Sequence, residues 1–476
     1  MPFGSSWRRR LRKASGALGL GKAAGSAAMA GEWQETTLGA LGSFRNGVNF
    51  NRSQEGLGLA VVKVKDFGER FFAPRSGYDE LDPNAIDITE SQLLHDGDVV
   101  IIRSNGNGNL LGRSLYVREP AGPLTFSGFC IRFRPNSSEI SPGFAAYLIR
   151  SPFFRRRFTA FGSGTGIQNL SQEILGSVPV SLPPLPEQRA IAHILGTLDD
   201  KIELNRKMNE TLEAMARAIF KSWFVDFDPV RAKMEGRWRK GESLPGLPVH
   251  LWDLFPDRLV DSELGKIPEG WRVSTIGAEL TTLLGGTPSR VESKYWDGGT
   301  IPWINSGKAN EFRIIEASEF ITQDGLNNSA TKMLPERTTV IAITGATLGQ
   351  VSLMEISACA NQSVVGVPGT STFPCEFVYF WVKENVAELV SSQTGGAQQH
   401  INKNNVNALK LLCPSRDVLA AYFEIVNPLF DTIKTNCFES RTLAAIRDVL
   451  LPKLLSGEIR VKDAEKVLNK QSGILL

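Results

Sequence analysis

The chain has 476 residues, 42% of them hydrophobic, so it can bury more than one core, and a typical domain length of about 150 residues predicts two to four units. Its formal net charge of +3 does not indicate a nucleic-acid partner, because residues 1–28 contribute +6 without an acid and the remainder carries −3. Five cysteines without a CxxC pair argue against a disulfide framework or a zinc ribbon and favour a reducing, cytoplasmic compartment. No run approaches 18 apolar residues, so no membrane span is expected.

The first 30 residues are rich in arginine and then in alanine and glycine, without the apolar core of a secretory signal. We interpret residues 1–30 as a disordered or spurious extension before a start at Met29. The stretch Gly16–Lys22 imitates a phosphate-binding loop, but Ala23 stands where a Ser or Thr would ligate magnesium and no strand precedes it. This segment is therefore not expected to bind a nucleotide.

A long helix is predicted within residues 182–227. Three prolines open the stretch, and from Glu187 only Gly196 interrupts a helical pattern that runs to about Phe224. Uncharged residues then recur at coiled-coil steps of 4, 3, 4 and 3, at Ile191, Leu195, Leu198, Ile202 and Asn205, and the seam continues through Met208, Leu212, Met215, Ile219 and Trp223. A helix with such a seam needs a partner.

The partner helix is predicted in the same chain, because the sequence repeats itself after 231 residues. The offset aligns, without a gap, Gly164 with Gly395, Gln168 with Gln399, Leu170 with Ile401, Leu175 with Val406 and Pro183 with Pro414. The second seam follows the same steps through Tyr422, Val426, Leu429, Ile433 and Asn436. We expect a second long helix within residues 414–457, ended at Gly457 by left-handed backbone, and a tail over 458–476.

Each long helix follows a domain of mixed α and β structure, residues 31–181 and 267–413. GEWQETTLG opens the first domain and EGWRVSTIG the second. Both then contain a predicted hairpin with a Gly-rich loop, at Asp98–Val117 and Thr338–Met354, and a helix, at Phe144–Phe158 and Phe377–Val390. Residues 228–266 are expected to be a strap that packs through Leu247, Leu251, Trp252, Leu254 and Phe255.

Catalytic and cofactor motifs are missing from the pattern. Glycines 106, 108 and 112, and glycines 162, 164 and 166, have the wrong spacing for a dinucleotide fingerprint. The four histidines, at positions 95, 193, 250 and 400, have no metal-ligand spacing. We find no nuclease-like cluster of acids and lysine, no Asn-Pro-Pro-Tyr and no nucleophile elbow, and we expect no catalytic residue, metal or cofactor on this chain.

Loop residues instead predict DNA contacts. In the second domain, Arg290, Lys294 and Lys308 could reach phosphates and Asn305 and Ser306 base edges, with Thr347 on the hairpin loop. The competing interpretation is a structural turn, and for Tyr295, Trp296 and Trp303 a place in the core is favoured. The first domain offers Arg103, Asn105, Asn107 and Arg113 on its hairpin loop, and Arg155 in a run of three arginines that either contacts phosphate or forms a solvated face.

The motifs PLPEQRAIAHIL, WFVDFDPVRAKMEG, SELGKIPEGW, GGTPSR, YWDGGTIPWI and SGEIRV, in this order and with this duplication, closely resemble the specificity subunit of type I restriction–modification enzymes. The likeness spans about Gly31–Val461. It implies two target-recognition domains that each read half of a bipartite site in double-stranded DNA, joined by two antiparallel helices that form a coiled-coil spacer. It also implies that two methyltransferase subunits and the motor–nuclease subunits supply all catalysis, using S-adenosylmethionine, ATP and Mg²⁺.

The resemblance further implies that Glu187 and Gln188, at the first helix start, contact the methyltransferase. The second helix begins PSRDVLAAYF and lacks this pair, so equivalent contacts at both helix starts are not implied. The rival hypotheses are a stand-alone nuclease or ATPase with an unrecognised motif, and a duplicated scaffold that binds protein.

Asn205 and Asn436 stand at matching seam positions, where a polar residue costs stability but can fix helix register. We therefore expect replacement of both by leucine to stabilise the helix pair while loosening its alignment.

Overall fold

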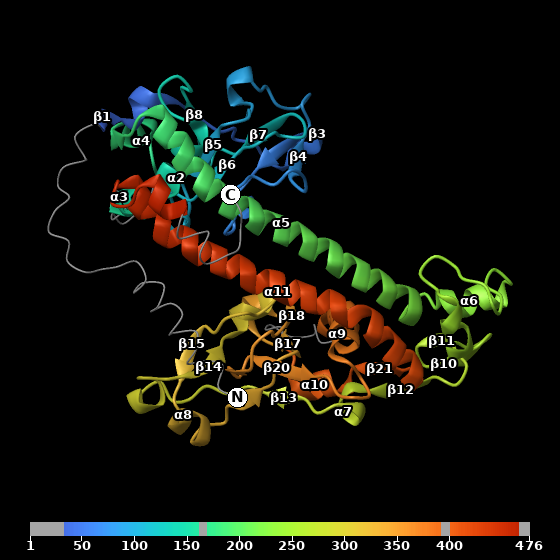
Figure 1. Cartoon of the computed structure of the whole chain (residues 1–476). Coiled ribbons are helices and arrows are strands. Elements are labelled where there is room, and N and C mark those ends of the chain that lie inside the picture. Colours follow the sequence, from blue (N-terminus) through green and yellow to red (C-terminus); the bar gives the residue numbers. More distant parts are fainter. Residues whose placement is uncertain (1–32, 161–168, 392–399, 466–476) are drawn as a thin grey trace. The chain divides into compact units, whose positions relative to one another are not determined.

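The computed structural model describes residues 33–160, 169–391 and 400–465 (Figure 1). Several features of the sequence analysis lie outside these residues. They are the N-terminal extension with the Gly16–Lys22 motif, glycines 162, 164 and 166, and the repeat pairs Gly164/Gly395 and Gln168/Gln399. Within them, no helix combines the length and the apolar character needed to cross a membrane.

The chain divides into two compact units, and the division cuts both long helices, α5 (Leu185–Phe224) and α11 (Arg416–Leu455). We call Leu204–Ser440 the central unit, and the described residues up to Glu203 with those from Arg441 the N-terminal unit. The prediction of two long helices is confirmed, and each has 40 residues. Each helix contributes one half to each unit because its two halves pack in different hydrophobic cores.

The recognition domain of the N-terminal unit is built on two small sheets. The first is four-stranded and antiparallel, in the order β2 (Gly42–Asn46), β8 (Cys130–Pro135), β5 (Val99–Ile102) and β6 (Ser114–Tyr116). The second contains β4 (Asp79–Leu81), β3 (Glu55–Val62) and β7 (Leu124–Phe126), and a separate pair joins β1 (Gln34–Thr37) to β9 (Pro179–Leu182). The helices are α2 (Pro142–Arg150), α3 (Pro152–Ala160) and α4 (Gln172–Gly176).

The domain of the central unit repeats this plan. Its main sheet has the order β13 (Leu283–Leu284), β20 (Val364–Pro368), β17 (Thr338–Ala342) and β18 (Val351–Leu353). A second sheet contains β15 (Glu319–Ile321), β14 (Ile301–Ile304), β19 (Ala358–Ala360) and β16 (Met333–Leu334), and β12 (Arg272–Thr275) pairs with β21 (Lys410–Cys413). The helices are α7 (Ile276–Glu279), α8 (Gln323–Asn327), α9 (Cys375–Ser391) and α10 (Lys403–Ala408).

Both predicted hairpins form, as β5–β6 and β17–β18, and they share a detail of backbone geometry. Gly112 and Gly349 adopt φ values of +74° and +81°, and each amide donates a 2.9 Å hydrogen bond to the strand opposite. A Cβ on Gly112 would lie 2.6 Å from the Phe158 ring, so this position requires glycine. The predicted helix in the first domain is split into α2 and α3 at Pro152, whereas α9 is continuous.

The strap over residues 228–266 contains α6 (Asp228–Met234), β10 (Leu259–Ser262) and β11 (Gly265–Pro268). Leu247, Leu251 and Phe255 are buried in the core of the central unit, where Phe255 meets the Trp223 ring of α5 edge-on at 5.0 Å. The prediction of a packed strap is confirmed. Gly457 also has the expected left-handed φ of +73°, two residues after α11 ends.

Within each unit α5 and α11 lie side by side (Figure 1). In the central unit, Asn205 donates to Ser440 (3.2 Å) and Asn436 donates to Asn209 (2.9 Å), so the two helices are antiparallel. In the predicted second half of the α5 seam, Trp223 is buried as expected, but Met208 and Met215 are wrong, because they are 39% and 50% exposed. Asn209, Glu213 and Ala216 are buried in their place, since Glu213 has a charged partner inside the unit.

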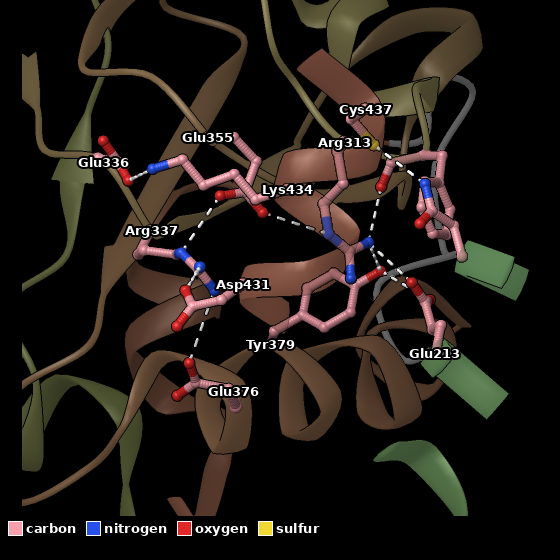
Figure 2. Close-up of polar contacts among 12 residues, drawn as sticks. Glu213, Arg313, Glu336, Arg337, Glu355, Glu376, Tyr379, Asp431, Lys434 and Cys437 are labelled. Atoms are coloured by element: carbon pink, nitrogen blue, oxygen red, sulfur yellow. Dashed lines mark hydrogen bonds and ion pairs between the residues drawn. The ribbon is translucent and has the colours of Figure 1, made fainter. Parts of the chain in front are cut away.

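A network of charged side chains ties the second domain to α5 and α11 within the central unit (Figure 2). Glu213 of α5 pairs with Arg313 (2.8 Å) and Lys383 (2.7 Å), and accepts a 3.1 Å hydrogen bond from the Tyr379 hydroxyl. Burial alone would raise the pKa of Glu213, but the two cations outweigh it and hold that pKa below its ordinary value. Both Glu213 and Arg313 are therefore expected to stay charged.

Arg337 extends the network towards α11, pairing with Asp431 (2.5 Å) and with Glu355 (3.2 Å). Glu355 is 1% exposed, and burial raises its pKa to about 7 in spite of Arg337 and Arg313. The carboxyl group is thus costly to ionise in the folded unit.

In the N-terminal unit, a smaller set of hydrogen bonds and ion pairs likewise joins the recognition domain to α5 and α11. The Tyr147 hydroxyl of α2 donates to Asp199 of α5 (2.7 Å), and Arg447 of α11 pairs with the other oxygen of Asp199 (2.5 Å). In each unit, therefore, a carboxylate on α5 accepts a hydrogen bond from a tyrosine of the recognition domain and pairs with an arginine.

The raised pKa of Glu355 predicts a pH dependence of stability. The folded chain binds this proton more tightly than the unfolded chain, so its contribution to the free energy of unfolding is present at pH 5 and lost as the pH rises through about 7. We expect Glu355→Gln to reduce the fall in stability between pH 5 and 8 by on the order of 1–3 kcal/mol. Denaturant unfolding at a series of pH values measures this difference.

Glu388→Gln, at an exposed position of α9, is the matched control and should leave the pH profile unchanged. Parallel profiles for the wild-type chain and Glu355→Gln would contradict the assignment.

Candidate nucleic-acid interface

The β5–β6 loop of the N-terminal unit is shaped by its own asparagines. The Asn105 side-chain oxygen accepts from the Asn107 amide (2.8 Å), and the Asn107 oxygen accepts from the Asn109 amide (3.0 Å), capping the 3₁₀ turn η6 (Gly108–Leu110). Asn105 and Asn107, which are predicted to contact DNA, thus hold the loop conformation through their oxygens. Asn107 is exposed and Asn105 half-buried.

Arg103 stands where the same loop leaves β5. Its Nε donates to the Asn169 side chain (3.0 Å), and its backbone amide donates to the Phe129 carbonyl (2.9 Å). The partner of the guanidinium is neutral, so its positive charge is not cancelled there. Phe129 is 58% exposed and therefore lies at the surface beside this arginine.

The structure brings Arg113 and Arg155 together at the base of the loop. Arg113 donates to the Gly68 carbonyl (2.7 Å) and pairs with Glu69 (2.8 Å), while Arg155 of α3 donates to the Asn109 carbonyl (2.9 Å). Burial lowers the pKa of Arg155, and the charge of Arg113 lowers it further. The two cations are thus close enough to repel each other.

The predicted cations of the central unit have acidic partners. Arg290 forms a two-bond pair with Glu319 (2.6 and 2.8 Å), and its guanidinium carbon lies 3.6 Å from the centre of the Trp296 ring. Lys308 is held between Glu311 (2.7 Å) and Glu316 (3.6 Å). A phosphate would have to compete with these carboxylates.

Lys294 is more accessible, with a side chain that is 61% exposed and 3.9 Å from Glu292. Trp303 is 3% exposed and donates to the Gly286 carbonyl (3.1 Å), and Trp296 packs edge-on against it. The favoured interpretation of Trp303 as a core residue is therefore confirmed, while Tyr295 and Trp296 are only half-buried.

The remaining polar candidates of the central unit gather in two adjoining turns. The Asn305 oxygen accepts from the Gly307 amide (2.9 Å) and caps η9 (Ser306–Asn310), which contacts η10 (Gly345–Thr347). Asn305 is exposed, and Ser306 and Thr347 are half-buried. The structure thus joins Asn305, Ser306 and Thr347, which lie about 40 residues apart in sequence, into one surface.

Glu187 and Gln188, the residues that the family resemblance implies for a methyltransferase contact, stand at the start of α5. Gln188 is 1% exposed, and its amide accepts from Ser141 (2.9 Å) and donates to the Pro183 carbonyl (2.9 Å). This side chain offers no surface to a partner in the present conformation. Glu187 is half-buried and pairs with Arg460 (2.8 Å).

Asn205 and Asn436 are buried in the helix seam, but their side chains do not bond to each other. Asn205 donates to Glu439 (2.7 Å), to Ser440 and to the Asn436 carbonyl, whereas the Asn436 amide donates to Asn209. Each asparagine thus bonds to a specific position on the opposite helix. This geometry is what a register-setting role requires.

These contacts revise the expected effect of leucine at both positions. Asn205→Leu with Asn436→Leu removes the bonds to Glu439 and Asn209 in a buried, polar part of the seam, so we expect a loss of about 1–3 kcal/mol rather than a gain. Chemical denaturation of the chain measures the change. Leu198→Ala, in the apolar part of the seam, is the comparison and should cost about 2–5 kcal/mol; greater stability of the double variant would refute the revision.

Sequence reasoning missed several arginines that lie near Arg113 and Arg155. Arg70, Arg150 and Arg447 line the same cavity, of about 480 Å³. They come from elements far apart in sequence, so no spacing rule relates them. Among the described residues, no group of three or more His, Cys, Asp or Glu side chains could hold a metal ion.

The fold and these loops define a duplicated recognition protein, with two α/β domains carried on two long helices. The chain belongs to the family of the type I restriction modification DNA specificity domain, whose model matches residues 32–214 and again 268–444. It is a specificity subunit, a component that carries DNA specificity while catalysis resides in other subunits of the enzyme.

Similar proteins bear the same name. The specificity subunit of the type I restriction enzyme HindI from Haemophilus influenzae is 28% identical over 391 residues, which are 73% of this chain and 84% of that protein. The MjaIX specificity subunit from Methanocaldococcus jannaschii is 26% identical, over 73% of this chain and 76% of that protein.

A solved structure, the S subunit of a type I restriction–modification system from M. genitalium, has a TM-score of 0.50 and 16% identity. The match covers 89% of this chain and 96% of that chain. It supports the fold assignment.

Proposed function

We propose that each recognition domain reads one half of a bipartite site in double-stranded DNA, and that α5 and α11 set the number of base pairs between the halves. The observation that carries this proposal is the duplication: two domains of the same fold present different polar loops, one set around Asn105 and Asn107 and the other around Asn305 and Thr347. A pair of domains selects better than one, because each base pair read contributes on the order of 1–3 kcal/mol of discrimination.

The chain works in this proposal as part of a cytoplasmic complex. Two methyltransferase subunits and the motor–nuclease subunits bind it and carry out methylation and cleavage with S-adenosylmethionine, ATP and Mg²⁺. Exposed apolar side chains on α5, Leu204, Met208 and Met215, provide surface for contact with other subunits. We keep Glu187 as a candidate contact on the basis of its half-exposed position.

The decisive experiment maps methylated adenines in the host genome with and without this gene. The proposal expects one two-part motif to lose its methylation on deletion and to regain it when the gene is restored together with its partner genes. Persistence of every two-part motif in the deletion strain, with the partner genes shown to be expressed, would overturn it.

Separate reading by the two domains predicts separable mutations. Asn305→Ala should weaken selection at one half-site by about 1–3 kcal/mol, and Asn107→Ala should do the same at the other half. Methylation of a duplex library with each position randomised measures both effects. Asn327→Ala, in the short helix α8, is the control and should alter neither half; relaxed selection at both halves in a single variant would contradict the division.

The spacer role predicts the effect of lengthening both helices. Four added residues correspond to about 6 Å of helix. We expect an insertion after Glu203 together with one after Ser440 to lengthen the preferred spacer by about one or two base pairs and to leave both half-sites unchanged. Methylation mapping of the variant measures the number of base pairs between the two half-sites. If this number does not change, the helices do not set the spacer length.

A further inference from the structure

A cavity of about 480 Å³ opens in the N-terminal unit, and its lining is strongly basic. Six arginines line it, from the segment after β3, the residue before β6, α2, α3 and α11: Arg70, Arg113, Arg150, Arg155, Arg156 and Arg447. Among the described residues, Glu69 and Asp448 line it as well, and Asp199, outside the lining, pairs with Arg447, so the six arginines outnumber these three carboxylates. We call this cavity the arginine cleft.

Backbone carbonyl groups hold several of these arginines, and a carbonyl group does not neutralise a charge. Arg150 donates to the carbonyls of Arg70 (2.7 Å) and Glu69 (3.1 Å), and Arg155 donates to that of Asn109 (2.9 Å). Burial lowers the pKa of Arg150, and the charge of Arg447 lowers it further. Cations that repel one another around a cavity favour an anion within it.

The duplication shows that this fold forms without the arginines of α3. The domains align on the left-handed glycines Gly112 and Gly349, and on the buried Phe144 and Phe377. The second domain has Gln350 at the position equivalent to Arg113 and keeps a cation, Lys383, at that of Arg150, but no arginine occurs in the part of α9 that corresponds to α3. The same fold forms with these residues, so Arg113, Arg155 and Arg156 need an explanation other than packing.

The arginine cleft adjoins the polar loop of the first domain. The Asn109 carbonyl that accepts from Arg155 belongs to the turn capped by Asn107. In duplex DNA a phosphate flanks every nucleotide. A protein loop that contacts nucleobase edges therefore has DNA phosphates close to the residues where the loop joins its strands. An acidic segment of a protein would have no comparable reason to lie beside this loop.

We propose that the arginine cleft binds a phosphate group of the DNA backbone next to the half-site read by the first domain. This inference rests on the proposed function. It gives a DNA-binding role to arginines that lie outside the β5–β6 loop. Arginines suit this task because their planar guanidinium groups bind phosphate through two hydrogen bonds. The contact carries no sequence information; it fixes where the loop stands along the DNA.

Two neighbouring arginines of α3 provide a matched test. Arg156 lines the cleft, whereas Arg157 lies outside the lining, with its guanidinium carbon 5.0 Å from the centre of the Phe153 ring. Arg156→Gln and Arg157→Gln remove the same charge from the same helix. Each variant is assembled with its methyltransferase partners, and binding to a duplex with the recognised site and to one without it is measured against salt concentration.

Loss of one phosphate contact predicts a slope of log K against log salt that is less steep by about 1 for Arg156→Gln. Affinity for both duplexes should fall by the same factor, and the half-site selected should not change. Arg157→Gln should match the wild-type complex. Equal slope changes in the two variants would overturn the proposal, because they would show a diffuse positive field rather than a site; equal melting temperatures of the two variants exclude a folding defect.

Other occupants give different results. If ATP at constant ionic strength stabilises the isolated wild-type chain against heat and not Arg156→Gln, the cleft takes nucleotide phosphates and the DNA assignment is wrong. If Arg156→Gln keeps the wild-type salt slope but assembles poorly with the methyltransferase, an acidic protein segment occupies the cleft. A wild-type complex that selects no two-part site rejects the proposed function itself, whereas normal selection with an unaltered Arg156→Gln slope rejects the cleft alone.

Discussion

The structure depends on buried carboxylates of α5 that must be paired with charged groups. Glu213 meets Arg313 and Tyr379 in the central unit, and Asp199 meets Arg447 and Tyr147 in the N-terminal unit. A buried ion left without its partner costs several kcal/mol, so each recognition domain can sit on its helix segments only in the orientation that completes these bonds. These pairs fix the orientation of each recognition domain, and therefore of its loops, relative to the helix segments of the same unit.

Comparison of the two duplicated domains distinguishes the features of the shared fold from the features of the loops, which differ. Both domains keep the four-stranded antiparallel sheet, the strand pair next to the long helix and the left-handed glycine of the hairpin. Their loop chemistry differs: Arg103 rests on the neutral Asn169, whereas Arg290 is neutralised by Glu319 and stacked on Trp296. Two surfaces on one scaffold suit a protein that must hold the same kind of ligand twice while reading a different sequence each time.

Much of the architecture could be predicted because it depends on local or periodic signals. The helical steps located α5 and α11, the Gly-rich turns located the hairpins, and Gly457 marked the end of α11. The candidate DNA-contacting site was harder to predict from the sequence than the fold. Asparagines 105, 107 and 305 fit DNA contacts by composition, but their oxygens also build the turns that carry them, which only the hydrogen bonds reveal. The resemblance implied a partner contact for Gln188, whereas its side chain is buried and bonds to Ser141 inside the unit.

The sequence by itself determined the duplication, the two long helices and the family, because a repeat and a hydrophobic period are properties of residue order. Only the tertiary structure decided which face of α5 is buried beyond Asn205, where Glu213 is inside and Met208 outside. It also decided that Arg113, Arg155 and Arg447 share one cavity. These outcomes depend on charged partners more than 40 positions away, and no spacing in the chain encodes which of them will meet.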